Sequence, residues 1–182
     1  KPRHLVVDFS RRLNSPKSSR ITKKNFLTSR KEFFYSAETV FDCSTLDFLS
    51  VDLFKYYLNE LCSLGKNFSF YTSGKLLNQE MCKMLSETNI TLFIPLDAAS
   101  QKTYGALHQK DFNVVTKNVR NLTSMRKGSR PKIELLFTPM HINKKEYKDF
   151  FKLAKSLNAN EIILTPVNTS QNTNSTIYLY LK

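Results

Sequence analysis

Three aspartates follow short apolar runs and are the residues best placed to do chemistry. Asp8, Asp42 and Asp97 each lie at the end of a run typical of a buried strand. If those strands are parallel, their carboxyl ends share one edge, where barrel enzymes place catalytic groups. Three carboxylates there, with His108 or His141 nearby, predict a divalent-cation site and a hydrolase-like reaction. We favour the alternative, in which strand-end aspartates fix turns or cap the following helices.

The three cysteines lie far apart, without paired spacing, at Cys43, Cys62 and Cys82. This excludes a disulfide framework, a zinc knuckle and a self-contained iron–sulfur motif, and it fits a reducing compartment such as the cytoplasm or an organelle matrix. Cys43 would lie at the edge with the aspartates, but a nucleophile needs a base and a lowered pKa, so we expect an inert thiol. Cys62 and Cys82 fall in apolar helical stripes, and both are expected in the core.

Basic residues predict a second class of function, the binding of an anionic partner such as RNA. The formal net charge is +13, and residues 1–36 carry ten Lys and Arg against two acids. Cations at this density attract phosphates through counterion release. Few aromatic residues lie among them, so only contact with a nucleic-acid backbone is predicted. The alternative is a solvated, Lys-rich surface. The candidate residues are Arg11, Arg12, Lys17, Arg20, Lys23, Lys24, Lys117, Arg120, Arg126, Lys127 and Arg130.

Short strand-like runs alternate with longer helical patterns, which predicts an α/β fold. Strands separated by helix-length connections are parallel, because a parallel return cannot be made in a tight turn. The expected strands are His4–Phe9, Thr39–Cys43, Asn67–Thr72, Thr91–Asp97, Lys132–Thr138 and Glu161–Val167, and the expected helices are 51–64, 78–87, 111–126 and 143–157.

The last two helices carry the clearest patterns. Asn143 followed by Glu146 predicts a capping box, with Ile142 and Tyr147 as a hydrophobic staple. Spacings of three and four residues predict inward faces made by Phe112, Val115, Val119 and Leu122 in one helix and by Phe150, Phe151, Ala154 and Leu157 in the other.

The length of 182 residues predicts one domain with three segments. Residues 1–36 would be the first strand plus a basic loop or arm, 37–167 the βα repeats, and 168–182 a polar linker with a terminal strand-like segment. The apolar runs are too short to span a bilayer. A first residue that is not methionine is expected of a processed or excerpted piece of a longer protein.

An ordered series of motifs resembles the radical S-adenosylmethionine (radical SAM) enzymes. Tyr71-Thr72-Ser73-Gly74 lies where that family has Thr-Asn-Gly after the third strand. Leu96-Asp97-Ala98-Ala99-Ser100, followed by Thr103-Tyr104, resembles its Ser-x-Asp-Ala motif and Thr-Tyr pair. Asn143–Tyr147 is similar to its Asn-x-x-Glu helix start, and Leu164-Thr165-Pro166 to the end of its sixth strand.

The resemblance implies a partial (βα)6 barrel whose strand ends surround a cofactor pocket. His108 corresponds to an Arg near the cofactor carboxylate, while the counterpart of Asp97 is largely architectural. The cofactor-binding positions that the resemblance implies are Thr72, Ser73, Gly74, Asp97, Ala98, His108 and Thr165.

The departures from the family concern its iron–sulfur chemistry. Radical SAM enzymes hold a four-iron four-sulfur cluster with Cys-x3-Cys-x2-Cys after the first strand. When Asn14 is matched to the Asn that commonly follows the first cysteine, the ligand positions become Leu13, Lys17 and Arg20. Leu has no donor atom and the other two are cations, so none replaces a thiolate. The family's Gly-Gly-Glu turn is replaced by Asp42-Cys43-Ser44-Thr45.

The sequence therefore predicts a degenerate radical-SAM-like domain, a non-catalytic binding or scaffolding module for an anionic partner such as RNA or for a peptide. No cofactor is expected in this chain. The alternative is a true radical SAM enzyme whose cluster loop is missing from the chain, which would require S-adenosylmethionine and a 4Fe-4S cluster. A third possibility is a barrel that uses its strand-end aspartates.

Overall fold

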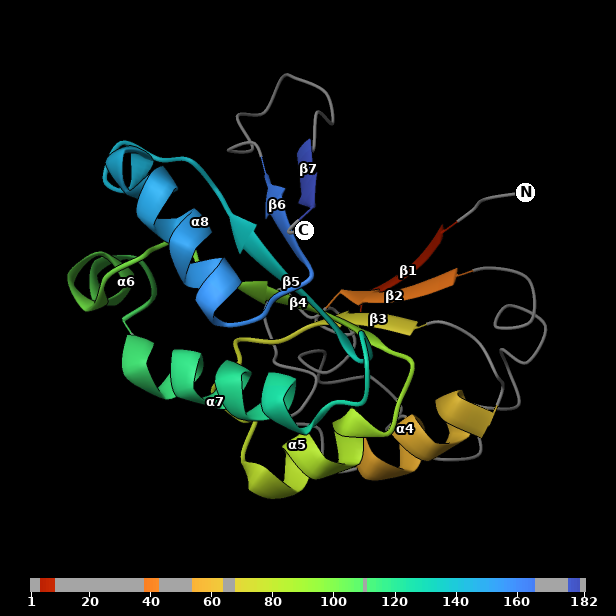
Figure 1. The fold of residues 1–182 in the computed structure, drawn as a ribbon. Coiled ribbons are helices and arrows are strands. Elements are labelled where there is room, and N and C mark those ends of the chain that lie inside the picture. Colours follow the sequence, from red (N-terminus) through yellow and green to blue (C-terminus); the bar gives the residue numbers. More distant parts are fainter. Residues whose placement is uncertain are drawn as a thin grey trace, which may run out of the picture. The chain divides into compact units, whose positions relative to one another are not determined.

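The structure is a computed structural model that describes residues 4–8, 38–42, 54–63, 68–109, 111–165 and 177–180. The chain divides into two compact units, residues 1–71 and 72–182. Parallel strands and helices make up both, so the expected α/β class is confirmed (Figure 1). The predicted segment boundaries after residues 36 and 167 remain predictions.

The first unit is built on three parallel strands. β1 (His4–Asp8) pairs with β2 (Glu38–Asp42), which pairs with β3 (Phe68–Tyr71). Asp8 and Asp42 are register partners, so these two strand-end aspartates share an edge as predicted. Helix α4 (Phe54–Ser63) places Phe54 edge-on against Phe70 of β3, with ring centroids 5.8 Å apart.

Cys62 corrects one prediction in this unit. Its side chain is exposed in the last turn of α4, whereas the apolar pattern predicted a core position. The same helix buries Phe54 and Leu58, four residues apart, and Cys62 is four residues further along. An apolar stripe identifies the side of a helix that faces the core, but it does not show how much of the helix length is packed against other residues.

The second unit contains four strands and most of the described helices. β4 (Thr91–Pro95), β5 (Lys132–Phe137) and β6 (Glu161–Leu164) are parallel, and β7 (Ile177–Tyr180) runs antiparallel to β6. The helical elements are α5 (Gln79–Ser86), α6 (Gln101–His108), α7 (Phe112–Met125), the 3-10 turn η2 (Lys144–Glu146) and α8 (Tyr147–Ser156).

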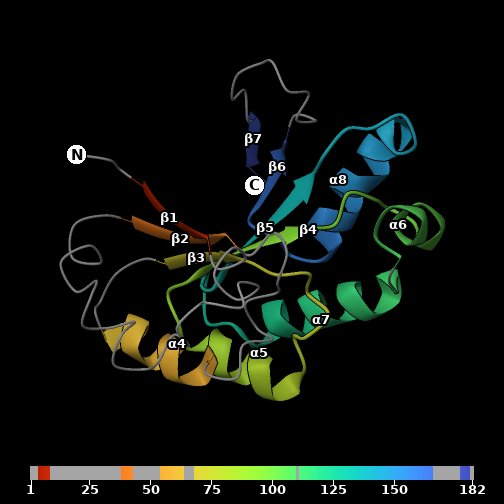
Figure 2. The same ribbon diagram turned by 180° about the vertical axis from the view of Figure 1, so that it is seen from behind.

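The helices of this unit bury the apolar faces that the sequence predicted. α5 packs beside α7, as both views show, and α8 packs on β6 (Figure 1 and Figure 2). The predicted face of α7 is buried at all four positions, and Phe150, Ala154 and Leu157 are buried in and after α8. Phe151 was also predicted to face inward, but it is only half-buried, and Lys155 Nζ lies 5.2 Å from its ring centroid. Phe150 contacts Phe137 of β5, with centroids 4.7 Å apart. These contacts fix the strand ends that carry the site.

Helix α6 was not predicted. Its Ser100 caps the first turn by accepting a hydrogen bond from Thr103 N, and its last residue is His108. The helix has eight residues and includes Gly105, so it offers little periodic signal. Asp111 then caps α7 by accepting from Asn113 N at 2.8 Å, which confirms the predicted start of that helix.

The predicted capping box at Asn143 is wrong. Asn143 makes no side-chain cap; its Oδ1 accepts from Met140 N at 2.6 Å, and Glu146 bonds elsewhere. The side chains of Ile142 and Tyr147 are 52% and 37% exposed. Within the described ranges, no helix is long and apolar enough to cross a bilayer.

Candidate functional site

The turn after β3 is a fixed structure built on Thr72, Ser73 and Gly74. Thr72 is buried, its N–H donates to Phe93 O of β4 at 3.0 Å, and its Oγ1 accepts from Gly74 N at 3.1 Å. Gly74 has φ +75°, and a Cβ there would lie 3.0 Å from Val115 Cγ1 of α7. Glycine is therefore required both by the left-handed backbone and by the close approach of α7.

Asn118 of α7 holds the same turn from outside, and the sequence did not single it out. Its Nδ2 donates to Gly74 O and to Lys75 O, both at 3.0 Å. The sequence offered one signal for Asn118: it is a polar residue next to Val119, which belongs to the buried face of the helix. The turn is therefore fixed by α7 as well as by β4.

Asp97 connects the end of β4 to two neighbouring elements. Its side chain is buried, Oδ1 accepts from Thr138 N at 2.6 Å, and Oδ2 lies 3.1 Å from His108 Nε2. Its backbone is left-handed, with φ +52°, and its carbonyl accepts from Asn143 Nδ2 at 2.8 Å. Aspartate is one of the few residues besides glycine that adopt this conformation. These bonds give Asp97 the architectural role that we favoured.

His108 faces Asp97 from the last position of α6. Its imidazole packs against the Tyr104 ring, with centroids 4.7 Å apart, and its side chain is 24% exposed. Burial, and secondarily the charge of Asp97, raises the pKa of Tyr104 to about 12. The residue at the position of the family's Arg is thus bonded to a carboxylate of its own chain.

Glu146 binds the N-terminal turn of α6. It accepts hydrogen bonds from Ala99 N at 2.7 Å, from Ser100 Oγ at 2.8 Å and from Thr103 Oγ1. Burial raises the pKa of Glu146, but the bonds from Thr103, Ala99 and Ser100 outweigh it, so the pKa lies below its ordinary value. The carboxylate that was predicted to cap its own helix caps a neighbouring one.

Thr138 and Thr165 complete a polar cluster at the carboxyl ends of β4, β5 and β6. Their Oγ1 atoms are 2.6 Å apart, and Thr165 N donates to Phe137 O at 3.1 Å. Thr138 therefore connects the predicted positions Asp97 and Thr165, and Asp97 in turn contacts His108. We call these four residues the strand-end cluster. Ala98 lies beside it and is buried.

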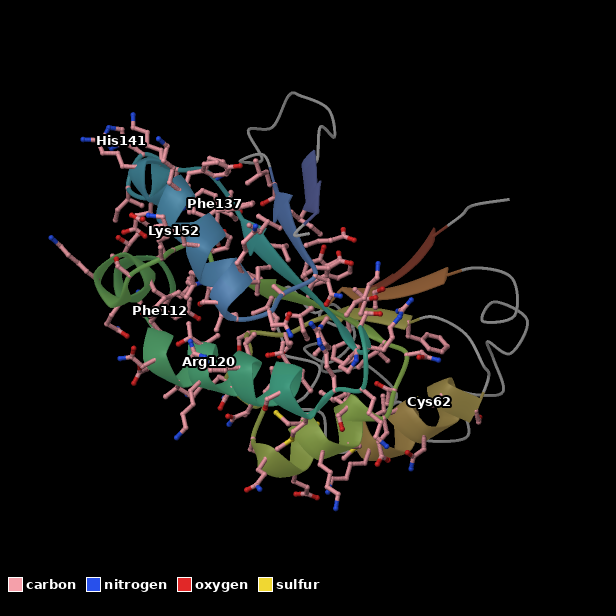
Figure 3. The ribbon with its side chains drawn as sticks, viewed as in Figure 1. Cys62, Phe112, Arg120, Phe137, His141 and Lys152 are labelled. Carbon is pink, nitrogen blue, oxygen red and sulfur yellow. The ribbon has the colours of Figure 1, made fainter. Side chains whose placement is uncertain are left out.

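The basic candidates fall into three groups. Arg11, Arg12, Lys17, Arg20, Lys23 and Lys24 lie outside the described residues. Lys117, Arg120 and Lys127 are exposed, and Figure 3 shows Arg120 on α7. Arg126 and Arg130 are half-buried and donate to carbonyl groups of the second unit.

The residues present do not fit a four-iron four-sulfur cluster. Leu13, Lys17 and Arg20 offer no thiolate at the positions that the resemblance assigns to its ligands. Cys82 is buried, its Sγ donates to Leu77 O at 3.4 Å, and burial raises its pKa to about 11. Among the described side chains, no group of three or more His, Cys, Asp or Glu could hold a metal ion. Cys43 and the side chains of Asp8 and Asp42 lie outside that search.

No protein-family model matches the sequence, and no curated protein matches it. Solved structures do. SuiB of Streptococcus suis, bound to its precursor peptide SuiA, matches with TM-score 0.62 and 10% identity over 71% of this chain and 28% of SuiB. SuiB bound to S-adenosylmethionine matches over 80% of this chain and 32% of SuiB. Archaeal TYW1 matches with TM-score 0.59 and 13% identity over 89% of this chain and 64% of TYW1.

These structural neighbours are radical SAM enzymes, and the chain spans about a third of the length of SuiB. At 10% to 13% identity the likeness shows the fold alone. The chain therefore has an α/β fold of the radical SAM barrel type, as the sequence motifs predicted.

Proposed function

We propose that this chain is a non-catalytic binding module built on a radical SAM-type scaffold. The observation that carries the proposal is the set of residues at the cluster positions, Leu13, Lys17 and Arg20. Without three thiolates the cluster has no anchor, and without the cluster no electron reaches a bound sulfonium. The scaffold then serves to bind a partner.

The strand-end cluster supports this proposal. In this cluster, one carboxylate oxygen of Asp97 accepts a hydrogen bond from Thr138 N, and the other faces His108 Nε2. A histidine held in this way connects α6 to the end of β4. The polar residues at the predicted cofactor positions thus bond to other residues of the second unit. A structural role explains their presence without a cofactor.

We propose a peptide as the partner of this module. SuiB, whose fold the chain shares, has been solved with a precursor peptide bound. In this chain Ile142 and Tyr147 expose apolar surface next to Asn143, which bonds to Asp97 O at 2.8 Å. Exposed apolar side chains near strand ends are a surface that a peptide would cover.

Anaerobic reconstitution with iron and sulfide tests the absence of cluster chemistry. The matched variant is Leu13→Cys/Lys17→Cys/Arg20→Cys, which restores the spacing Cys-x3-Cys-x2-Cys in the same chain. We expect no stoichiometric cluster in the native chain and a cluster absorbance in the variant. Stoichiometric iron and sulfide in the native chain would contradict the proposal and favour a true radical SAM enzyme.

A further inference from the structure

The turn between α7 and β5 carries three cations, Arg126, Lys127 and Arg130, within five residues. Lys127 and Arg130 form an isolated antiparallel bridge, so they face each other across Gly128 and Ser129. Bridge partners project to the same side, and like charges directly opposite each other are destabilising. Arg126 immediately precedes the pair. The turn therefore concentrates positive charge at one point of the second unit.

Neutral groups hold the two arginines of this turn. Arg126 Nη1 donates to Asn160 Oδ1 at 2.6 Å and to Pro131 O at 3.2 Å, and its Nη2 donates to Asn158 O at 2.5 Å. Arg130 Nη1 donates to Asn89 O at 3.1 Å. These bonds fix the guanidinium groups in place, but they leave both charges uncompensated.

One nitrogen of the Arg126 guanidinium is shielded from water. Its Nε is buried and is the one such side-chain nitrogen or oxygen without a hydrogen-bond partner in the part of the chain that the structure describes. Burial lowers the pKa of the Arg126 guanidinium, which means that the site disfavours its charge. A nearby anion would offset that cost.

No described carboxylate pairs with a cation of this turn. Among the described residues, the close contacts between basic and acidic side chains join His108 to Asp97, Lys132 to Glu161 and Lys152 to Asp149, and none includes a residue of the turn. Lys117 and Arg120 are exposed on α7, three residues apart, and continue the charge along the helix that ends at the turn. No acid lies between residues 112 and 133.

We infer that this turn, with the exposed side of α7, binds the phosphodiester backbone of a nucleic acid. Arg presents a fork of donors that suits phosphate oxygens. The described cations lie without aromatic residues between them, so contact with the backbone and not with bases is expected. The turn precedes β5, at the amino ends of the strands, so this site is separate from the strand-end cluster and does not rest on the proposed function.

A charge-matched pair of variants tests the site in the full chain. Lys127→Gln/Arg130→Gln removes two charges from the turn, and Lys144→Gln/Lys148→Gln removes two exposed charges from η2 and α8. Fluorescence anisotropy with a short single-stranded RNA is measured across a salt series. We expect the turn variant to bind roughly tenfold more weakly, with a log–log salt slope smaller by about 1.4. The control should change less than about twofold.

Two further measurements keep the inference falsifiable. Lys117→Gln/Arg120→Gln changes only exposed side chains of α7, so it should weaken binding even if Arg130→Gln impairs folding. A DNA of the same sequence should bind within about threefold of the RNA, because only the backbone is contacted. Equal losses in turn and control variants, equally tight binding of polyglutamate, or no RNA binding at low salt would overturn the inference.

Discussion

At the scale of single residues, Asp97 has a large predicted effect on stability. Asp97→Ala removes the acceptor of Thr138 N and the partner of His108. It also places alanine in the left-handed conformation, at φ +52°. An unsatisfied N–H and a left-handed backbone together predict a loss of about 2–4 kcal/mol in the free energy of unfolding, measured by urea denaturation.

Asp97→Asn is the matched control for that substitution. Asn keeps an oxygen for Thr138 N and tolerates the left-handed conformation, so we expect less than about half of the loss. If Asp97→Ala and Asp97→Asn had equal and small effects, the architectural role of Asp97 would be wrong.

Glu146 predicts a specific dependence of stability on pH. Its folded pKa lies below the unfolded value near 4.5, so its contribution is present above that value and is lost as pH falls through the folded pKa. Glu146→Gln should cost roughly 1 kcal/mol at neutral pH, and the difference from the native chain should shrink below about pH 4. Denaturation across a pH series measures both.

Glu87→Gln is the control for this pH series. Glu87 is exposed, and no ion pair or side-chain hydrogen bond of its carboxylate is seen among the described residues. Its substitution should change stability by less than about 0.5 kcal/mol. A Glu146→Gln variant with the same pH profile as the native chain would contradict the role of Glu146 at the start of α6.

At the scale of elements, substitutions of two glycines distinguish the cost of a left-handed backbone from the cost of a steric contact with α7. Gly74 and Gly128 have similar positive φ angles, +75° and +68°, but a Cβ would meet Val115 only at Gly74. We expect Gly128→Ala to cost about 1–2 kcal/mol and Gly74→Ala a further 1–3 kcal/mol, roughly, by urea denaturation. Equal losses would show that α7 does not constrain the turn after β3.

The sequence predicted the elements with strong local patterns and missed those defined by contacts. Short apolar runs predicted β4, β5 and β6, and a 3-4-3 spacing predicted the buried face of α7. The capping box at Asn143 was wrong because Asn143 Oδ1 accepts from Met140 N, while its Nδ2 donates to the carbonyls of Asp97 and Thr138. Asp97 is 46 residues away in the sequence, so a local pattern could not reveal that bond.

In the candidate site, too, contacts between residues distant in sequence could not be predicted. The resemblance indicated Thr72–Gly74, Asp97 and Thr165, but not Asn118, which binds Gly74 O across 44 residues of chain. Likewise Arg126 counted as one cation of a basic run, whereas its bonds to Asn158 and Asn160 join two loops. Side chains that bind distant carbonyls leave no periodic signal in the sequence.

At the scale of the whole molecule, a shared fold does not imply a shared cofactor affinity. At the positions that the resemblance assigns to the cluster ligands and to the glycine-rich turn, this sequence has Leu13, Lys17 and Arg20 and Asp42-Cys43-Ser44-Thr45. We therefore expect S-adenosylmethionine to bind, if at all, with a Kd of roughly millimolar order, measured by calorimetry. A micromolar Kd that Ala98→Leu abolishes would show a maintained cofactor pocket.

The most direct test of the non-catalytic proposal is the formation of 5′-deoxyadenosine. The native chain is incubated anaerobically with iron, sulfide, a strong reductant and S-adenosylmethionine, beside a control without iron. Because Leu13, Lys17 and Arg20 supply no thiolate, we predict the same background amount of product in both. Product above the iron-free control, in proportion to the native chain, would contradict the account and show that the scaffold retains radical SAM chemistry.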